Sequence, residues 1–192
     1  MIVKLWWLLR TLAYKPFLGS LGKLSYLGKP LFVSNLRRVF IGSKVRIFPL
    51  ARIEVIGKNS SITFKDDISI GQYFHIVSKG DLTIGKGSTI SANVLITNID
   101  HEYQEINKHI LDQPLIIKET QIGENCFIGY GAVIQAGTIL GKQCIVGANA
   151  VVRGHYRDYS VIVGVPARVV KRYDIEKEKW RKTDKKGEFI DE

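Results

Sequence analysis

A short polar run near the middle of the chain has side chains that could do acid–base chemistry. It reads T-N-I-D-H-E-Y over residues 97–103 and is dense in groups that bind hydroxyls or move protons. His101 is the candidate general base, because imidazole titrates near neutral pH, where a sugar hydroxyl is a poor nucleophile. Such a base contributes about 10² to 10⁴ in rate, or about 3–5 kcal/mol of barrier. Asp100, Glu102 and Asp112 are alternative partners for orienting the imidazole, and the sequence does not choose among them.

Six-residue repeats flank this run on both sides. An aliphatic residue returns at every sixth position, at Ile84, Ile90 and Ile96 and again at Ile122, Ile128, Ile134, Leu140, Val146 and Val152. A helix repeats near 3.6 residues and a strand at 2, so this period requires a coil whose straight segments and turns together use six residues. Hexapeptide periods are typical of a parallel β-helix. Fainter repeats begin at Ile41 and Ile70, and the slips between them predict imperfect coils before Ile84.

The repeat is interrupted where the polar run begins. It continues through Ile96 and resumes at Ile116, so residues 97–115 are predicted to leave the coil as a loop. Loops on a rigid scaffold concentrate function, and His101 is the histidine at the corner where the repeat breaks. His75, near the end of an earlier strand, could line an acceptor pocket, although such a histidine is more often a surface residue. No role is assigned to His109 or His155.

Positive charge is concentrated in the N-terminal third. The chain carries a formal charge of +10, and residues 1–58 contain many lysines and arginines but a single carboxylate, Glu54. Such a face could meet anionic lipid, an anionic saccharide or a phosphate-bearing ligand. No nucleic-acid fold signature accompanies it, so nucleic acid is not an expected partner.

The opening stretch, Ile2 to Tyr14, is predicted to be a helix that is too short to span a bilayer. It lacks the features of a signal peptide, so we expect the protein in the cytoplasm, with the inner face of the membrane as the alternative. One side of this helix is apolar: Ile2, Leu5, Trp6, Leu9, Leu12 and Ala13. Two interpretations remain open, an interfacial membrane helix giving peripheral membrane contact and a cap over one end of the β-helix, and the cap is favoured.

Two cysteines complete the inventory of reactive side chains. Cys126 and Cys144 occupy equivalent hexad positions, which predicts that they lie on neighbouring coils if three hexads make one coil. We expect two small buried thiols and neither a disulfide scaffold nor a metal site.

Three features together resemble the hexapeptide-repeat acyltransferases, in particular the branch with maltose and galactoside acetyltransferases and polysaccharide O-acetyltransferases. They are the hexads, the I-T-N-I-D-H-E-Y stretch at 96–103 and V-I-V-G-V-P-A-R-V-V-K at 161–171. The resemblance implies a left-handed parallel β-helix and a homotrimer with active sites at the subunit interfaces. It also implies acetyl-CoA as the acyl donor, no metal, and His101 as the base that deprotonates the acceptor.

The same resemblance implies the residues that contact the acyl donor. In the cofactor site, Gly164 and Ala167 would give the pantetheine arm clearance, Pro166 would fix the turn, and Arg168 and Lys171 would face the phosphates. The remaining cofactor contacts would fall on Tyr130, Ala148 and Arg153. The family commonly has a small residue at the first of these positions and a Thr-Lys pair in place of Arg153 and Gly154. For the saccharide acceptor, the candidate contacts come from the residues themselves: Asn98, Asp100 and Tyr103 in the polar run, and His75.

These expectations define an all-β chain in three parts. Residues 1–40 form a basic, apolar N-terminal segment, residues 41–170 the β-helix with its loop at 97–115, and residues 171–192 a short helix around Ile175 to Lys182 followed by a tail. The predicted function is acetyl-CoA-dependent O-acetylation of a saccharide in the synthesis of a bacterial capsule, O-antigen or exopolysaccharide. The alternatives are N-acetylation of a nucleotide-linked amino sugar and a β-helix without acyltransferase activity. The latter would be a scaffold or a carbonic-anhydrase-like enzyme with three histidines on zinc.

Overall fold

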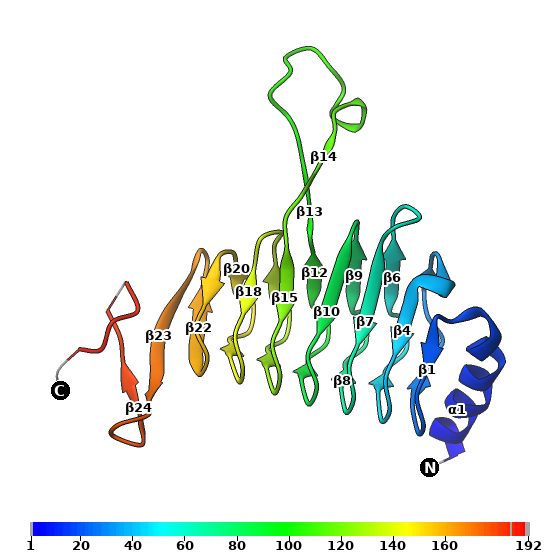
Figure 1. Ribbon diagram of the computed structural model, residues 1–192, viewed down its shortest axis with the longest axis horizontal. Coiled ribbons are helices and arrows are strands. Elements are labelled where there is room, and N and C mark those ends of the chain that lie inside the picture. The colour runs from blue at the N-terminus through cyan, green and yellow to red at the C-terminus, as the bar shows by residue number, and fades with distance from the viewer. Residues whose placement is uncertain (1, 185, 191–192) are drawn as a thin grey trace.

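A computed structural model describes residues 2–184 and 186–190, with side chains from Leu5 onward. The chain winds into a parallel β-helix, and helix α1 (Ile2–Tyr14) lies across its N-terminal end (Figure 1). Short 3₁₀ turns occur at η1 (Lys15–Phe17), η2 (Leu36–Arg38) and η3 (Ile110–Asp112). The predicted parallel β-helix is therefore confirmed.

Three parallel sheets form the walls of the solenoid within the described residues. Sheet A contains β1 (Ser20–Leu21), β4 (Val39–Ile41), β7 (Ser61–Phe64), β10 (Asp81–Ile84), β15 (Thr120–Ile122), β18 (Ile139–Leu140) and β21 (His155–Tyr156). Sheet B contains β2 (Tyr26–Leu27), β5 (Arg46–Ile47), β8 (Ser69–Ile70), β11 (Thr89–Ile90), β16 (Phe127–Ile128), β19 (Ile145–Val146), β22 (Ser160–Gly164), β23 (Ala167–Asp174) and β24 (Lys179–Lys182). Sheet C contains β3 (Phe32–Val33), β6 (Arg52–Val55), β9 (His75–Ser78), β12 (Leu95–Thr97), β17 (Val133–Ile134) and β20 (Val151–Val152).

The six-residue repeat supplies the core of this solenoid. Ile90 pairs with Ile128, which pairs with Val146, so equivalent hexad positions of successive coils lie in register. These side chains are at most 1% exposed. Where a strand of sheet A turns into sheet B the coils approach so closely that a Cβ on Gly85 would lie 2.3 Å from the Gly123 carbonyl oxygen. Glycine is required at this corner because no side chain fits between the two backbones.

The coils before Ile84 are longer, as the slips in the repeat predict. Ile47 pairs with Ile70 and Ile70 with Ile90, with more residues between partners than in the later coils. The additional residues lie in the turns at 56–60 and 79–80, at the corner where sheet C leads into sheet A. The predicted loop at 97–115 leaves the solenoid at the same corner, so the insertions in the described coils all lie on one side.

The β-helix begins at Ser20, earlier than the predicted boundary at residue 41. β1, β2 and β3 form a first coil in which Leu21, Leu27 and Val33 pair with Ile41, Ile47 and Ile53. The six-residue spacing was present in the sequence. It was obscured because the first turn carries Leu24 at φ 59° instead of a glycine or asparagine.

Helix α1 is joined to this first coil by one face. The buried Thr11 hydroxyl accepts a hydrogen bond from the Leu27 N–H at 2.7 Å and lies 2.6 Å from the Trp7 carbonyl oxygen. The Trp7 ring packs against Tyr26 and Phe48, with centroids 5.6 and 5.7 Å away. The helix therefore caps the solenoid. None of the described helices is long and apolar enough to cross a membrane.

The predicted helix around Ile175 to Lys182 is wrong, because this segment forms a β-hairpin. β23 turns back along β22 and β24 along β23, so sheet B ends in antiparallel strands. Asp174 and Arg181 form a buried ion pair at 2.8 Å, and Tyr173 packs on Trp180 with centroids 5.7 Å apart. Pairing with the open edge of sheet B outweighs the weak helical pattern of a charged, apolar-poor segment.

Both cysteines are free and buried, as predicted. They lie on neighbouring coils, since the adjacent residues Phe127 and Ile145 are partners in sheet B. Hydrogen bonding with Cys144, together with burial, raises the pKa of the Cys126 thiol, which keeps it protonated and unreactive.

Candidate functional site

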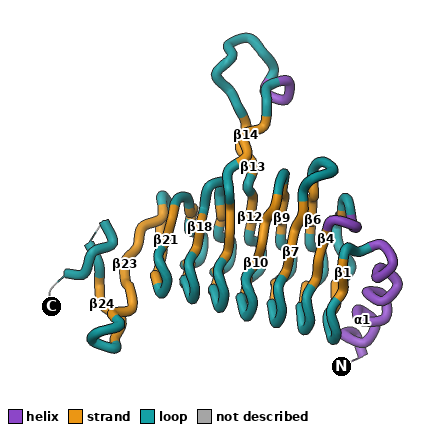
Figure 2. The backbone as a smooth tube through the Cα atoms, in the orientation of Figure 1, coloured by secondary structure: helices purple, strands orange, loops and turns teal. Residues whose placement is uncertain are grey.

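The predicted loop is a two-stranded stalk that projects from the corner between sheets C and A (Figures 1 and 2). β13 (Ile99–His101) and β14 (Leu115–Ile117) pair antiparallel, with His101 opposite Leu115. At its tip the buried Gln113 side chain hydrogen-bonds the backbone of Glu105 and of Lys108. The stalk is thus ordered by its own hydrogen bonds.

Asn98 anchors the base of the stalk. Its Oδ1 accepts a hydrogen bond from the Lys79 N–H at 2.9 Å, and its Nδ2 donates to the Lys79 carbonyl at 3.0 Å. The side chain is 1% exposed, so the prediction that Asn98 contacts the saccharide is corrected. It continues the pairing of sheet C for one more residue at the point where the chain leaves the coil.

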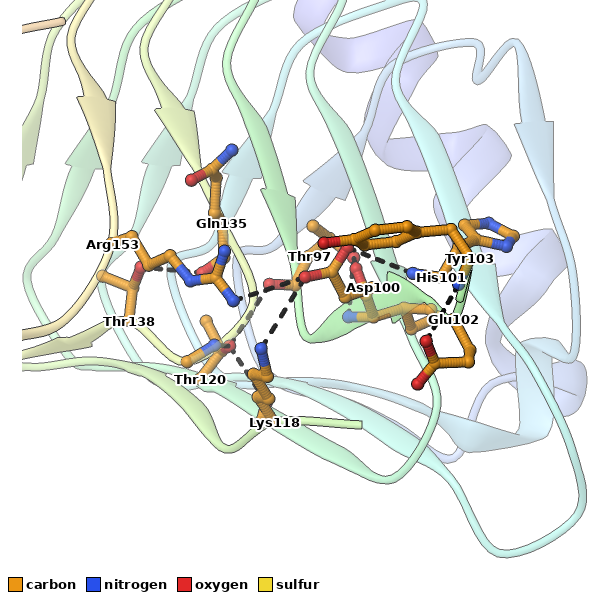
Figure 3. A network of polar contacts seen from close by, with 12 residues as sticks. Thr97, Asp100, His101, Glu102, Tyr103, Lys118, Thr120, Gln135, Thr138 and Arg153 are labelled. Atoms are coloured by element: carbon orange, nitrogen blue, oxygen red, sulfur yellow. Dashed lines mark hydrogen bonds and ion pairs between the residues drawn. The ribbon is translucent and has the colours of Figure 1, made fainter. Parts of the chain in front are cut away.

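Asp100 connects the stalk to the coils (Figure 3). Its Oδ1 accepts a hydrogen bond from the His101 backbone N–H at 3.1 Å. Its Oδ2 lies 3.3 Å from Arg153 Nη2 and 3.7 Å from Lys118 Nζ. The two cations come from outside β13, one directly after β14 and one after β20. The carboxylate therefore fixes the main chain at His101 relative to the solenoid.

The imidazole of His101 is free to meet a substrate. The residue is exposed, and its side chain makes no hydrogen bond within the described residues. None of the three carboxylates considered as orienting partners contacts the ring in that part of the chain; Glu102, for example, accepts hydrogen bonds from the backbone of Tyr103 and Gln104. Tyr103, two residues after His101, is 72% exposed. An unpaired, exposed imidazole on a fixed backbone can accept a proton from a bound hydroxyl.

A row of polar residues at the foot of the stalk was not identified as a group from the sequence. On three successive coils, the residue after the last core position of sheet C is polar: Thr97, Gln135 and Arg153. These residues therefore lie in a row at the carboxyl-terminal ends of β12, β17 and β20. The buried Thr120 hydroxyl accepts a hydrogen bond from the Gly137 N–H at 3.1 Å and lies 3.2 Å from the Thr97 carbonyl oxygen. The sequence signal for this polar row was the position of its members in the hexad, directly after the aliphatic residue.

The predicted coenzyme A residues lie mainly at a different corner. Tyr130 and Ala148 occupy the turn from sheet B to sheet C on successive coils, and the Asn149 N–H donates to the Tyr130 carbonyl at 2.8 Å. Gly164 follows Ile162 as Ala148 follows Val146, so it extends the same row by one coil. Arg153 is the exception, because it lies at the other end of the strands of sheet C, directly after β20, and pairs with Asp100.

The final turn of this row is a tight hairpin. Gly164 pairs with Ala167 across a cis Val165–Pro166 peptide, and Gly164 has φ 102°, which favours glycine. Ala167 is buried, whereas Arg168 and Lys171 are exposed on β23. Arg168 Nη1 donates to the Ala167 carbonyl at 3.0 Å. The turn thus offers exposed backbone with Arg168 next to it and Lys171 further along β23, opposite Val161. Exposed cations at these positions can accommodate a phosphate-bearing chain.

His75 lies outside the stalk network, on the outer face of β9. Its Nε2 is 2.9 Å from Glu54 Oε1, and that carboxylate also binds the Arg52 guanidinium. The hydrogen bond from Arg52, and to a smaller extent that from His75, lowers the pKa of Glu54. The assignment of His75 to the acceptor pocket stays a prediction. Among residues 2–184 and 186–190, no three His, Cys, Asp or Glu side chains of this chain converge to hold a metal ion.

Comparison with known proteins agrees with this architecture. Residues 119–154 match the family described as bacterial transferase hexapeptide (six repeats). The chain is 31% identical over 163 residues to the putative lipopolysaccharide biosynthesis O-acetyl transferase WbbJ of Escherichia coli (strain K12), covering 80% of this chain and 81% of that protein. It is 32% identical over 173 residues to the probable acetyltransferase Rv3034c of Mycobacterium tuberculosis (strain ATCC 25618 / H37Rv), covering 88% of this chain and 57% of that one.

A solved structure shares the fold. AntD, an N-acyltransferase from Bacillus cereus in complex with dTDP and 3-hydroxybutyryl-CoA, superposes with a TM-score of 0.72 at 19% identity, covering 87% of this chain and 89% of that one. The hexapeptide repeat and the relationship to the Escherichia coli protein over most of both chains thus define a β-helical transferase. The chain belongs to the hexapeptide-repeat acyltransferase family. The predicted family and the predicted enzyme class, an acyltransferase, are confirmed.

Proposed function

We propose that this protein is an acetyl-CoA-dependent O-acetyltransferase that modifies a saccharide during the assembly of a bacterial surface polysaccharide. The observation that carries the proposal is the exposed imidazole of His101 on a stalk whose backbone is held by Asp100 and Asn98. The relationship to a lipopolysaccharide O-acetyl transferase over most of both chains supports the acceptor class. Acetyl as the transferred group rests on the same relationship.

In the proposed reaction the His101 imidazole takes the proton of an acceptor hydroxyl as the oxygen attacks the thioester carbonyl. The carbon–sulfur bond then breaks, and the coenzyme A sulfur leaves with the proton that the imidazolium returns. The products are the sugar acetate ester and free coenzyme A. Asp100 acts as a positioning residue in this scheme, because it holds the His101 backbone and not the ring. Tyr103 and His75 are proposed to contact the acceptor.

For the acyl donor we propose the row of Tyr130, Ala148 and Gly164, continued by the turn through Pro166 and Ala167. Arg168 and Lys171 would neutralise the phosphates of coenzyme A, a role suited to exposed cations on a rigid strand. Arg153 would then be shared between the Asp100 carboxylate and a substrate phosphate. The solved relative with bound acyl-CoA supports this class of donor.

We further propose a homotrimer with the active site between subunits. The stalk with His101 follows the carboxyl-terminal end of a strand of sheet C, whereas the proposed donor row precedes the amino-terminal ends of the strands of that sheet. Within one chain, the base and the proposed donor site therefore lie on opposite sides of sheet C. A neighbouring copy would bring its own donor row against the stalk, since closed symmetry places unlike edges of identical subunits together. We place the reaction on the cytoplasmic side, at the inner face of the membrane when the acceptor is lipid-linked.

Thiol release from acetyl-CoA with a panel of acceptors tests this proposal. We expect turnover with hydroxyl-bearing glycans, lipid-linked or free. The product should be heavier than the acceptor by one acetyl group (about 42 mass units), and mild alkaline hydrolysis should remove that group, because it is held by an ester bond. His101→Ala should lower kcat about 10²- to 10⁴-fold, and His109→Ala on the same stalk should leave it unchanged. Turnover of nucleotide-linked amino sugars alone would overturn O-acetylation in favour of N-acetylation. Bound zinc with no thiol release would overturn both.

A further inference from the structure

The outer face of helix α1 presents a ridge of apolar side chains. Leu5, Trp6, Leu9 and Leu12 are 50–66% exposed and lie on one side of the helix at spacings of three and four residues. Thr11 and Trp7 on the opposite side already hold the helix on the first coil. Helix α1 therefore contacts the first coil through one face, and its other face, with Leu5, Trp6, Leu9 and Leu12, is exposed.

Two further exposed apolar residues follow the helix, and one of them, Leu24, lines the same surface hollow as Leu12. Phe17, in the 3₁₀ turn after the helix, is 55% exposed, and Leu24, in the turn between β1 and β2, is 71% exposed. Exposed large apolar residues gathered in one patch mark an interaction surface, in contrast to single ones scattered over a protein. We name these six residues, Leu5, Trp6, Leu9, Leu12, Phe17 and Leu24, the terminal ridge.

Lysines border the terminal ridge. A surface hollow of about 180 Å³ lies between α1 and the first coil, and its walls include Leu12 and Leu24 together with Lys15 and Lys23. Both lysines are exposed. On α1 itself, Arg10 Nε and Nη2 are buried with no hydrogen-bond partner in the described part of the chain, so no carboxylate neutralises this guanidinium. The sequence has no acidic residue before Glu54.

We propose that the terminal ridge and its lysines are a docking surface for a bilayer that contains anionic lipid. Apolar side chains with a tryptophan enter the boundary between headgroups and acyl chains, and neighbouring lysines attract anionic headgroups. A protein partner of comparable apolarity would not by itself account for the uncompensated positive charge. In Figure 1 the helix closes one end of the solenoid while the stalk leaves its side, so docking at this end leaves the stalk uncovered.

Cosedimentation with vesicles tests the proposal. We expect the full-length protein to sediment with vesicles of phosphatidylethanolamine and phosphatidylglycerol and to bind pure phosphatidylcholine at least about tenfold more weakly. Trp6→Ser combined with Leu9→Ser should lower the partition coefficient about tenfold or more. Lys15→Glu combined with Lys23→Glu should lower it comparably for anionic vesicles alone.

Matched variants at the far end provide the controls. Ile175→Ser removes another side chain that is 71% exposed, and Lys177→Glu with Lys182→Glu makes the same change in charge away from α1. We expect both to bind vesicles as the unmodified protein does. All variants should retain circular dichroism and thiol release with a soluble acceptor, so a failure of membrane docking is distinguishable from a failure of the proposed catalysis.

Equal vesicle binding by the unmodified protein and the Trp6/Leu9 variant would overturn the proposal. If that variant also had a lower sedimenting mass in the absence of vesicles, the terminal ridge would be assigned to contact with a second copy of the chain.

Discussion

Asn98→Ala should loosen the stalk while leaving the solenoid folded. The substitution removes two hydrogen bonds to Lys79, at 2.9 and 3.0 Å, from a side chain that is 1% exposed. A hydrogen bond contributes about 1 kcal/mol net, and a partner left unsatisfied raises the cost to about 1–3 kcal/mol. Since the Lys79 backbone is half-buried, we expect the free energy of unfolding to fall by about 2–4 kcal/mol in total.

The functional effect should exceed that of a general loss of stability. Asn98 precedes β13, and its carbonyl accepts from the Lys118 N–H at 2.9 Å, so both strands of the stalk depend on its position. We expect faster hydrogen exchange over residues 98–118, measured by mass spectrometry, and a lower kcat with protection elsewhere retained. Asn107→Gly is the control, because Asn107 is exposed in the same loop at φ 62°, which glycine adopts freely. Unchanged exchange in the stalk of Asn98→Ala, or a loss of stability below about 0.5 kcal/mol, would refute the reasoning.

Three further outcomes check the rest of the fold. Thr11→Val should lower the free energy of unfolding by about 1–3 kcal/mol in urea titration, because it leaves a buried N–H of the first coil unpaired; an unchanged midpoint would contradict the capping contact. The hydrogen bond from Arg52 lowers the pKa of Glu54, so the stabilisation that Glu54→Gln removes should be full at neutral pH and shrink as the pH falls below the usual 4.5; a loss independent of pH would exclude this ion pair as its source. Asp174→Asn should speed hydrogen exchange in β23 and β24, since the carboxylate pairs with Arg181 at 2.8 Å, and equal protection would show the pair to be dispensable.

Much of the solenoid could be predicted because the repeat is dictated by close packing. Coils this near to one another accept a narrow set of residues, such as Gly85 at the corner and Ile90 in the core, and these leave a periodic record in the sequence. The first coil departs from this periodic pattern at Leu24, where a bulky residue takes the turn conformation that usually selects glycine or asparagine. The final hairpin has no repeat at all, because antiparallel strands on an open edge need only alternate pairing and the local contact between Asp174 and Arg181.

The site was predictable in part for the same reason. A break in a strict period locates the stalk, and the assignment of His101, which lies in that break, as the base stays a prediction. The sequence could not assign Asn98, because an asparagine that binds backbone and one that binds sugar have the same composition and neighbours. It also could not pair Arg153 with Asp100, since these residues are brought together only when the number of residues in each coil is known.

The corner from which the stalk leaves constrains how the enzyme works. Insertions elsewhere would separate strands that must pair, whereas the corner between sheets C and A has taken extra residues in the turns at 56–60 and 79–80 as well as in the stalk. The proposed donor row, where sheet B turns into sheet C, holds Tyr130 and Ala148 in turns whose backbones are hydrogen-bonded to each other. That row cannot bend toward the stalk without breaking the ladder of sheet C. In the proposed homotrimer the base and the donor row come from neighbouring subunits, so mixing His101→Ala chains with Gly164→Trp chains, each expected to be inactive alone, should restore activity.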